Sequence, residues 1–124
     1  MARYIDGFVL PVPKGKLQIY KKMAQEAGRV WKKHGALEYL ECVGDDLNPQ
    51  MKGMKFQKFP QIAKAKPNEE VIFSFITYKS KAHRDKVNAM VMEEFMANKK
   101  YKDRPMPFDM KRMAYGGFKT LVDL

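Results

Sequence analysis

The spacing of apolar positions changes repeatedly along the chain, and each change predicts a new element of secondary structure. Residues 4–12 alternate loosely and end in Pro11-Val12-Pro13, which cannot continue a hydrogen-bonded ladder. From Leu17 onward the period becomes helical over about five turns. One stripe of this helix contains Leu17, Tyr20, Ala24, Ala27, Trp31 and His34. These patterns predict a strand followed by an amphipathic helix.

A single glycine marks the end of this helix. Gly35 stands where a left-handed cap is favoured, and Lys32, Lys33 and His34 place cationic side chains in the last turn, where they suit the helix dipole. Residues 36–43 then alternate and predict a second strand.

The middle of the chain is a long connection followed by the clearest strand. Residues 47–70 are basic but too apolar for a free linker, so we expect them to pack down as an irregular arm or a short extra element. Residues 70–78 are rich in β-branched and aromatic side chains on both faces. This strand therefore belongs near the centre of a sheet.

A second helix and a last strand complete the pattern. Ser80 suits the N-cap of a helix that ends near Asn98. The helical period places Val87, Met90, Val91 and Phe95 on its inner face, and leaves outside it Arg84, Asp85, Asn88 and Glu93. Residues 112–122 predict a strand interrupted by Gly116-Gly117, which indicates a bulge or a close backbone approach.

In chain order the predicted elements are β-α-β, an arm, and β-α-β. This is the ferredoxin-like order, an α+β sandwich in which a four-stranded antiparallel sheet carries two helices on one face. A length of 124 residues suits one domain, and we assign residues 1–124 to it. The uncovered face, to which we assign Tyr4 and Phe8, is expected to pack against a second copy in a homodimer.

Composition adds a strong positive charge and a single thiol. The formal net charge of +10 favours polyanions such as RNA, anionic lipid heads or an acidic partner, although a solvated basic surface is the alternative interpretation. Cys42 is the only cysteine, which excludes an intramolecular disulfide and a four-cysteine metal cluster. No apolar run has the length of a signal core or a membrane span, so we expect a cytoplasmic protein.

Several blocks distributed over nearly the whole chain closely resemble the YbaA-like family of uncharacterised bacterial proteins. The blocks are residues 6–13, 31–46, 59–67, 82–85 with 87–89, 106–113 and 115–118. That family is similar in fold to the dimeric α/β-barrel superfamily, whose members pair two ferredoxin-like sheets face to face. The superfamily includes cofactor-free quinone-forming monooxygenases, haem-degrading enzymes, dye-decolourising peroxidases and ligand-sensing regulator domains. The resemblance implies the fold and the dimer and leaves the reaction open.

The junction between the first helix and the second strand carries the first candidate site. His34 and Glu41 flank it, and a histidine beside a carboxylate can act as a general acid/base pair. The alternative is a helix-terminal histidine in a surface hydrogen bond. No His-x-x-x-His or Cys/His cluster supports a metal site, and we assign neither a metal nor a cofactor.

Aromatic side chains near this junction are candidates for substrate binding. Trp31 lies on the apolar stripe, where a core role competes with stacking on a substrate. Tyr39 shares a strand face with Glu41, and Tyr4 shares one with Asp6. All four could line one pocket only if their strands were neighbours, and in the usual ferredoxin-like order they are not.

Two further candidates follow the proline-rich loop of residues 105–109. Arg112 could bind a carboxylate or phosphate through its guanidinium fork, or could pair with Asp109 and fix the loop. Tyr115 lies beside Gly116-Gly117, which either open a ligand space or relieve a crowded contact.

The sequence therefore supports two functional hypotheses. The first is a homodimeric small-molecule-binding protein, either a binder or a cofactor-free enzyme that acts on a small aromatic or carbonyl compound. In the enzymatic version His34 and Glu41 are catalytic, with His34 as the base, and Trp31, Tyr39, Arg112 and Tyr115 bind the substrate. The second hypothesis is a non-catalytic protein whose basic surface engages RNA or an acidic partner, without a membrane association.

Overall fold

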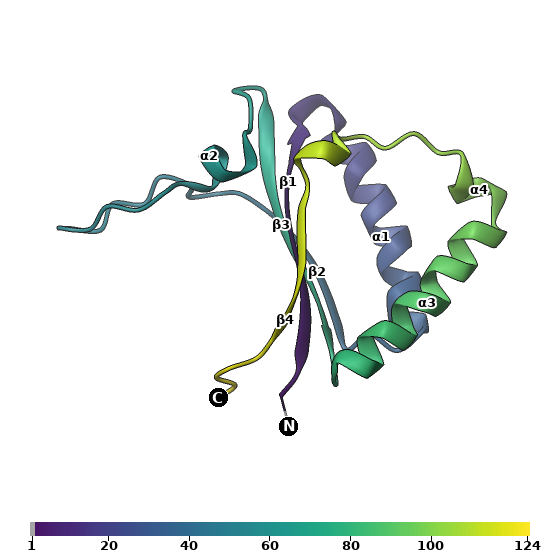
Figure 1. Cartoon of the computed structure of the whole chain (residues 1–124). Helices are drawn as coiled ribbons and strands as arrows, with labels where there is room; N and C mark the ends of the chain where they lie inside the picture. The colour runs from purple at the N-terminus through teal and green to yellow at the C-terminus, as the bar shows by residue number, and fades with distance from the viewer. Residues whose placement is uncertain (1) are drawn as a thin grey trace.

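A computed structural model describes residues 2–124 and shows one antiparallel sheet with its long helices on one face (Figure 1). The strands are β1 (Tyr4–Pro13), β2 (Glu38–Val43), β3 (Glu69–Tyr78) and β4 (Ala114–Lys119). The helices are α1 (Leu17–Lys33), α2 (Phe59–Ala63), α3 (Lys81–Ala97) and α4 (Lys99–Lys102), with short 3-10 turns η1 (Lys14–Lys16) and η2 (Met110–Arg112). The predicted α+β, ferredoxin-like class is confirmed.

The sheet order is β2-β3-β1-β4, so the first and third strands are the inner ones. In the β1–β3 ladder Tyr4 lies opposite Tyr78 and Pro13 lies opposite Glu69. The expectation that residues 70–78 form an inner strand is confirmed, and β2 and β1 are separated by β3. The last strand is shorter than predicted, because residues 110–112 form a 3-10 turn and β4 ends at Lys119.

Local signals account for the helix boundaries. The hydroxyl oxygen of Ser80 accepts a hydrogen bond of 3.1 Å from the backbone N–H of His83, as an N-cap does. Gly35 has a φ of 116°, which an L side chain rarely adopts, and it lets the chain leave α1 and turn toward β2. Both predicted boundaries are confirmed.

The core lies between the sheet and the helices α1 and α3 in two neighbouring clusters. The cluster toward α3 contains Val30, Ala36, Ile76, Tyr78, Val87 and Val91. The cluster toward the start of α1 contains Leu10, Val12, Tyr20, Ala24 and Ile72. Phe8 packs against both clusters and Tyr4 against the first, so assigning them to the uncovered face was wrong. The alternation of side chains along the strand predicts that Tyr4, Asp6 and Phe8 share a face. It does not indicate whether the helices cover that face.

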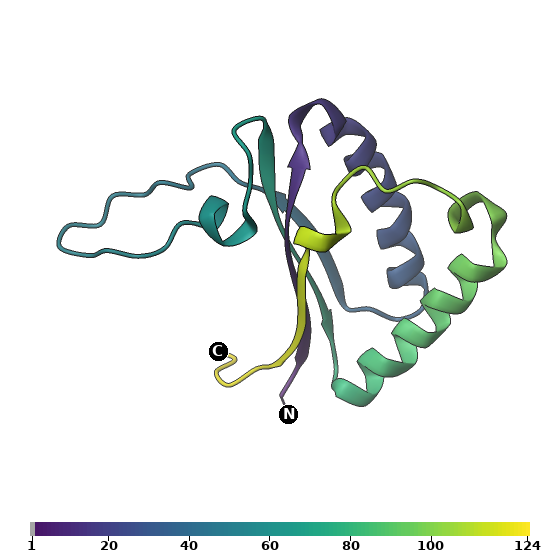
Figure 2. The ribbon, with the colours of Figure 1, turned by 45° about the horizontal axis from the view of Figure 1, so that its top comes forward.

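The opposite face of the sheet is covered only in part, by α2, while the connection that precedes α2 projects away from the sheet (Figures 1 and 2). The Phe59 ring of α2 packs edge-on against Phe73 of β3, with 6.3 Å between ring centroids. Leu40 and Phe118 remain exposed, and we call this side of the sheet the open face. No helix within residues 2–124 is long and apolar enough to cross a membrane.

Candidate functional site

The carboxylate of Glu41 accepts a hydrogen bond from a tyrosine hydroxyl on each of its oxygens. The hydroxyl of Tyr20 lies 2.7 Å from Oε1, and that of Tyr39 lies 2.8 Å from Oε2. Tyr20 comes from α1, whereas Tyr39 and Glu41 are two residues apart on β2 and therefore share the face that α1 covers. Helix and strand together build this Tyr20–Glu41–Tyr39 triad.

Burial sets the protonation of the two tyrosines. Removal from water raises the pKa of both phenols, and the negative charge of Glu41 raises it further. Tyr20 and Tyr39 consequently stay protonated through the physiological range and act as hydrogen-bond donors. The group of the triad that can accept a proton from a bound molecule is the Glu41 carboxylate.

The triad forms the wall between two hollows. The larger is a groove of about 700 Å³ between α1 and the β2 edge, with an apolar floor and a basic rim. The smaller, of about 130 Å³, lies between α1 and the sheet. Tyr20, Tyr39 and Glu41 line both. A ligand in either hollow would therefore touch the same three polar groups.

A glycine in α1 makes this arrangement possible. A Cβ at Gly28 would come within 2.7 Å of the Tyr39 ring, closer than real Cβ contacts. A helix interior normally disfavours glycine by about 1 kcal/mol relative to alanine. Here the missing side chain lets the Tyr39 ring lie against the helix and direct its hydroxyl at Glu41.

His34 does not pair with Glu41. Its Nε2 lies 2.8 Å from Oε1 of Glu94 on α3, and Lys33 contacts the same carboxylate. Hydrogen bonds from Lys33 and His34 lower the pKa of Glu94. The histidine at the end of α1 thus connects the two long helices, and the two residues predicted to be catalytic lie in different contact networks.

Trp31 and Tyr39 both line the smaller hollow, between α1 and the sheet. Their rings are tilted against one another with centroids 5.9 Å apart, and the indole N–H of Trp31 donates to Oδ1 of Asn88 over 3.0 Å. The structure therefore brings together Trp31, Tyr39 and Glu41 from the predicted site.

Arg112 is fully engaged within the chain. Its guanidinium donates to both carboxylate oxygens of Glu69 over 2.7 and 2.8 Å, to the carbonyl of Lys64 over 2.9 Å and to Asp109 over 3.1 Å. The alternative interpretation, an ion pair between Asp109 and Arg112, is confirmed. These contacts leave little of the fork free to bind an anion.

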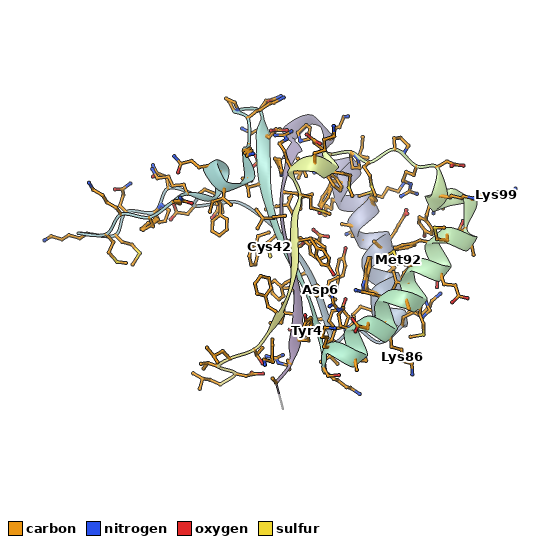
Figure 3. The ribbon with its side chains drawn as sticks, in the orientation of Figure 1. Tyr4, Asp6, Cys42, Lys86, Met92 and Lys99 are labelled. Atoms are coloured by element: carbon orange, nitrogen blue, oxygen red, sulfur yellow. The ribbon has the colours of Figure 1, made fainter. Side chains whose placement is uncertain are left out.

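A second polar cluster, buried under α3, surrounds Asp6. Asp6 is 1% exposed and accepts hydrogen bonds from Arg84 over 2.9 Å and from Asn88 over 3.3 Å. Arg84 also donates to the hydroxyl of Tyr115 over 2.9 Å, while the Tyr115 ring stacks on Phe8. Figure 3 shows Tyr4 and Asp6 projecting from β1 into the layer under α3. We call Asp6, Arg84, Asn88 and Tyr115 the Asp6 cluster.

The glycine pair of β4 belongs beside this cluster. Gly117 lies opposite Asp6 in the β1–β4 ladder, and a Cβ there would come within 2.5 Å of the Tyr4 hydroxyl. Gly117 therefore relieves a crowded contact between strands, as one of the two interpretations of this pair proposed.

Comparison with known proteins places the chain among uncharacterised relatives. Residues 3–110 match the family described as "Protein of unknown function (DUF1428)". The uncharacterized protein YbaA of Escherichia coli strain K12 is 41% identical over 121 residues, which cover 98% of each chain. The chain belongs to this family. YbaA of Shigella flexneri matches over the same span with the same 41% identity.

A solved structure supports the fold assignment for this DUF1428 member. The crystal structure of a dimeric ferredoxin-like protein from an uncultured marine organism superposes with a TM-score of 0.61 over the whole of both chains. The two sequences are only 7% identical, so this likeness concerns the fold. The resemblance to YbaA-like proteins is confirmed.

Sequence reasoning missed Tyr20, Arg84 and Asn88 as members of polar clusters. Arg84 and Asn88 were assigned to the outer face of α3, and that assignment was wrong because both bond to Asp6. They are four residues apart, and together with Val87 and Val91 they form one continuous helical stripe. The available signal was Asp6, an acidic residue among the apolar residues of β1. A carboxylate at that position needs polar partners, and the facing helix supplies them.

Proposed function

We propose that this protein is a homodimeric, cytoplasmic small-molecule-binding protein whose ligand occupies the groove between α1 and β2. The observation that supports this most is the Tyr20–Glu41–Tyr39 triad in the wall of a 700 Å³ groove. Ligand sites are mostly apolar hollows of this size that contain a few fixed polar groups. The reducing cytoplasm suits the single exposed thiol of Cys42.

The lining of the groove favours a small compound with an apolar body and an electron-rich oxygen. Leu17, Val43 and Ile72 supply the apolar floor, and Lys21 and Arg29 supply positive charge at the rim. An aromatic or carbonyl compound fits this division, with its ring or chain on the floor and its oxygen toward the rim.

A catalytic version of this proposal uses proton transfer to Glu41. The carboxylate would accept a proton from an acidic C–H or O–H of the ligand, and the two tyrosine hydroxyls would hold it in position. His34 takes no part in this version, because its imidazole is bonded to Glu94 outside the groove. Arg112 and Tyr115 are likewise engaged elsewhere, by Glu69 and Arg84.

A thermal-shift screen of small aromatic and carbonyl compounds, followed by calorimetry on each hit, tests the site. We expect hits that bind the native protein to lose about tenfold or more in affinity in Glu41→Gln, because a hydrogen bond to a charged group is worth roughly 1.5–3 kcal/mol. Tyr39→Phe should also weaken binding, because it removes a hydrogen bond that holds the Glu41 carboxylate in position. Glu38→Gln is the matched control, since this glutamate lies on the other face of β2. Equal affinity in all three variants would exclude the groove as the binding site.

A further inference from the structure

The connection between β2 and α2 stands off the body of the molecule as a long arm, residues 44–58 (Figures 1 and 2). It turns back at its tip, where the N–H of Met54 donates to the carbonyl of Met51 over 3.0 Å and Gly53 has a φ of 77°. Met51, Met54 and Phe56 are 55%, 60% and 42% exposed. An arm that carries three large apolar side chains in solvent is typical of a segment that docks on a partner.

The arm projects on the same side as the open face and is anchored there. Figure 1 shows the arm and α2 on the side of the sheet opposite α1 and α3. The Phe59–Phe73 contact ties its end to β3. A partner that covers Leu40, Phe73 and Phe118 would therefore also meet the arm.

The length of the arm decides how far it reaches along such a partner. An extended chain gains about 3.3 Å per residue, so the outgoing run from Gly44 to Met51 spans at most about 23 Å. Two sheets that pack face to face lie only about 10 Å apart. If two open faces meet, each arm extends past the sheet of the other copy and lies against its flank.

Charge is distributed unevenly along the arm, and Lys58 stands at the end that returns to α2. Asp45 and Asp46 stand at its outgoing root, and Lys52 and Lys55 stand near its tip. None of these four forms an ion pair with another side chain of residues 2–124. In a dimer with two-fold symmetry, every contact between the copies occurs twice, with the two partners exchanged. Two arms that run past one another therefore bring the tip of each arm to the root of the other.

We infer that the arms are exchanged in the homodimer, with the basic, methionine-bearing tip of each copy docked against the acidic root of the other. This inference rests on the proposed dimer and identifies the segment that holds it together. A second copy fits better than an anionic membrane or RNA, because Asp45 and Asp46 would be repelled by a polyanion while they complement Lys52 and Lys55 at the tip of a second arm.

Two oppositely reversed chains test the exchange. One carries Asp45→Lys and Asp46→Lys, and the other carries Lys52→Glu and Lys55→Glu. Each alone places like charges at both contacts, and we expect its dimer dissociation constant to rise at least about tenfold. Mixed together they restore opposite charges at both contacts. Native mass spectrometry of the mixture should then show heterodimer well above the one-half expected from random pairing.

The mixing experiment excludes an explanation within one chain, since a contact inside a single arm cannot favour heterodimers. The matched control reverses Lys86 and Lys99, which lie on the helical layer away from the arm (Figure 3), and should leave the dimer unchanged. A monomeric native protein would overturn both the dimer and the exchange. A native dimer with random pairing in the mixture would overturn the exchange alone.

A fourth outcome would replace the second copy by another partner. If Lys52→Glu with Lys55→Glu abolished co-sedimentation with phosphatidylserine vesicles or retention on single-stranded RNA, yet left the dimer constant unchanged, the arm would be a polyanion-binding segment and the exchange would be wrong.

Discussion

At the scale of single residues, two carboxylates on the helix-covered face of the sheet are balanced in different ways. Asp6 is held by a guanidinium and an amide under α3, whereas Glu41 is held by two neutral hydroxyls beside a groove. The charge of Asp6 is neutralised by Arg84 within the chain, whereas Glu41 forms no ion pair with a side chain of residues 2–124. This difference is why we assign ligand binding to Glu41 and a structural role to the Asp6 cluster.

The buried ion pair gives a prediction at this scale. The side chains of Asp6 and Arg84 are 2% and 15% exposed, so Arg84→Met leaves a buried carboxylate without its cation. We expect the free energy of unfolding in urea to fall by about 3 kcal/mol. Adding Asp6→Asn should recover part of that loss, because the uncompensated charge is removed. Lys81→Met on the same helix removes only an exposed pair with Asp85 and should change stability little.

At the scale of elements, the sequence predicted what depends on periodicity and missed what depends on side-chain pairing. α1 was found because every member of its stripe is apolar or aromatic up to His34. On α3 the inner positions Val87 and Val91 were assigned correctly, whereas Arg84 and Asn88 were placed outside because they look like surface residues until Asp6 is known to lie beneath them. The Tyr20–Glu41–Tyr39 triad could not be predicted for a similar reason, since only the fold places Tyr20 of α1 next to Glu41 of β2.

The start of β4 depends on an ion pair that titrates. Hydrogen bonds from Arg112 lower the pKa of Glu69 from 4.5 to about 2 and join η2 to the start of β3. Because the folded state holds the carboxylate more acidic than the unfolded state does, the pair stabilises the fold above about pH 4.5. This contribution is lost progressively as the pH falls toward 2.

Glu69→Gln tests that link through its pH dependence. The substitution should lower stability at pH 7 and flatten the fall in stability between pH 4.5 and 2, as measured by urea unfolding across that range. Glu70→Gln, the next residue on β3, is the control and should keep the native slope. An unchanged slope in Glu69→Gln would mean that this carboxylate titrates alike in the folded and unfolded states.

At the scale of the whole molecule, the sheet has one face under α1 and α3 and one face with exposed apolar side chains. Burial of such a face normally requires a partner. The sequence predicted an arm or short element over residues 47–70 but not that residues 44–58 stand off the body. It placed Tyr4 and Phe8 on the wrong face, because the parity of β1 cannot be read from a strand that is apolar on both sides.

Phe118→Asp tests whether the open face is the dimer interface. Phe118 is 63% exposed in the single chain, so a charge there should leave the fold intact while opposing burial against a second copy. We expect light scattering at micromolar concentration to give the dimer mass for the native protein and the monomer mass for the variant, with unchanged circular dichroism. Met96→Asp, an exposed substitution on α3, should remain dimeric. Dimers of Phe118→Asp would place the interface elsewhere.

The position of β4 beside β1 has a consequence for synthesis on the ribosome. Tyr4 of β1 is paired with Lys119 of β4, so one edge of β1 stays unpaired until β4 has been synthesised. Until then the nascent chain exposes a row of unpaired backbone groups on an apolar strand, the kind of edge that recruits other strands. Contacts between residues so distant along the chain also slow folding. A truncated product that lacks β4 would therefore be prone to aggregate, even though most of its core residues are present.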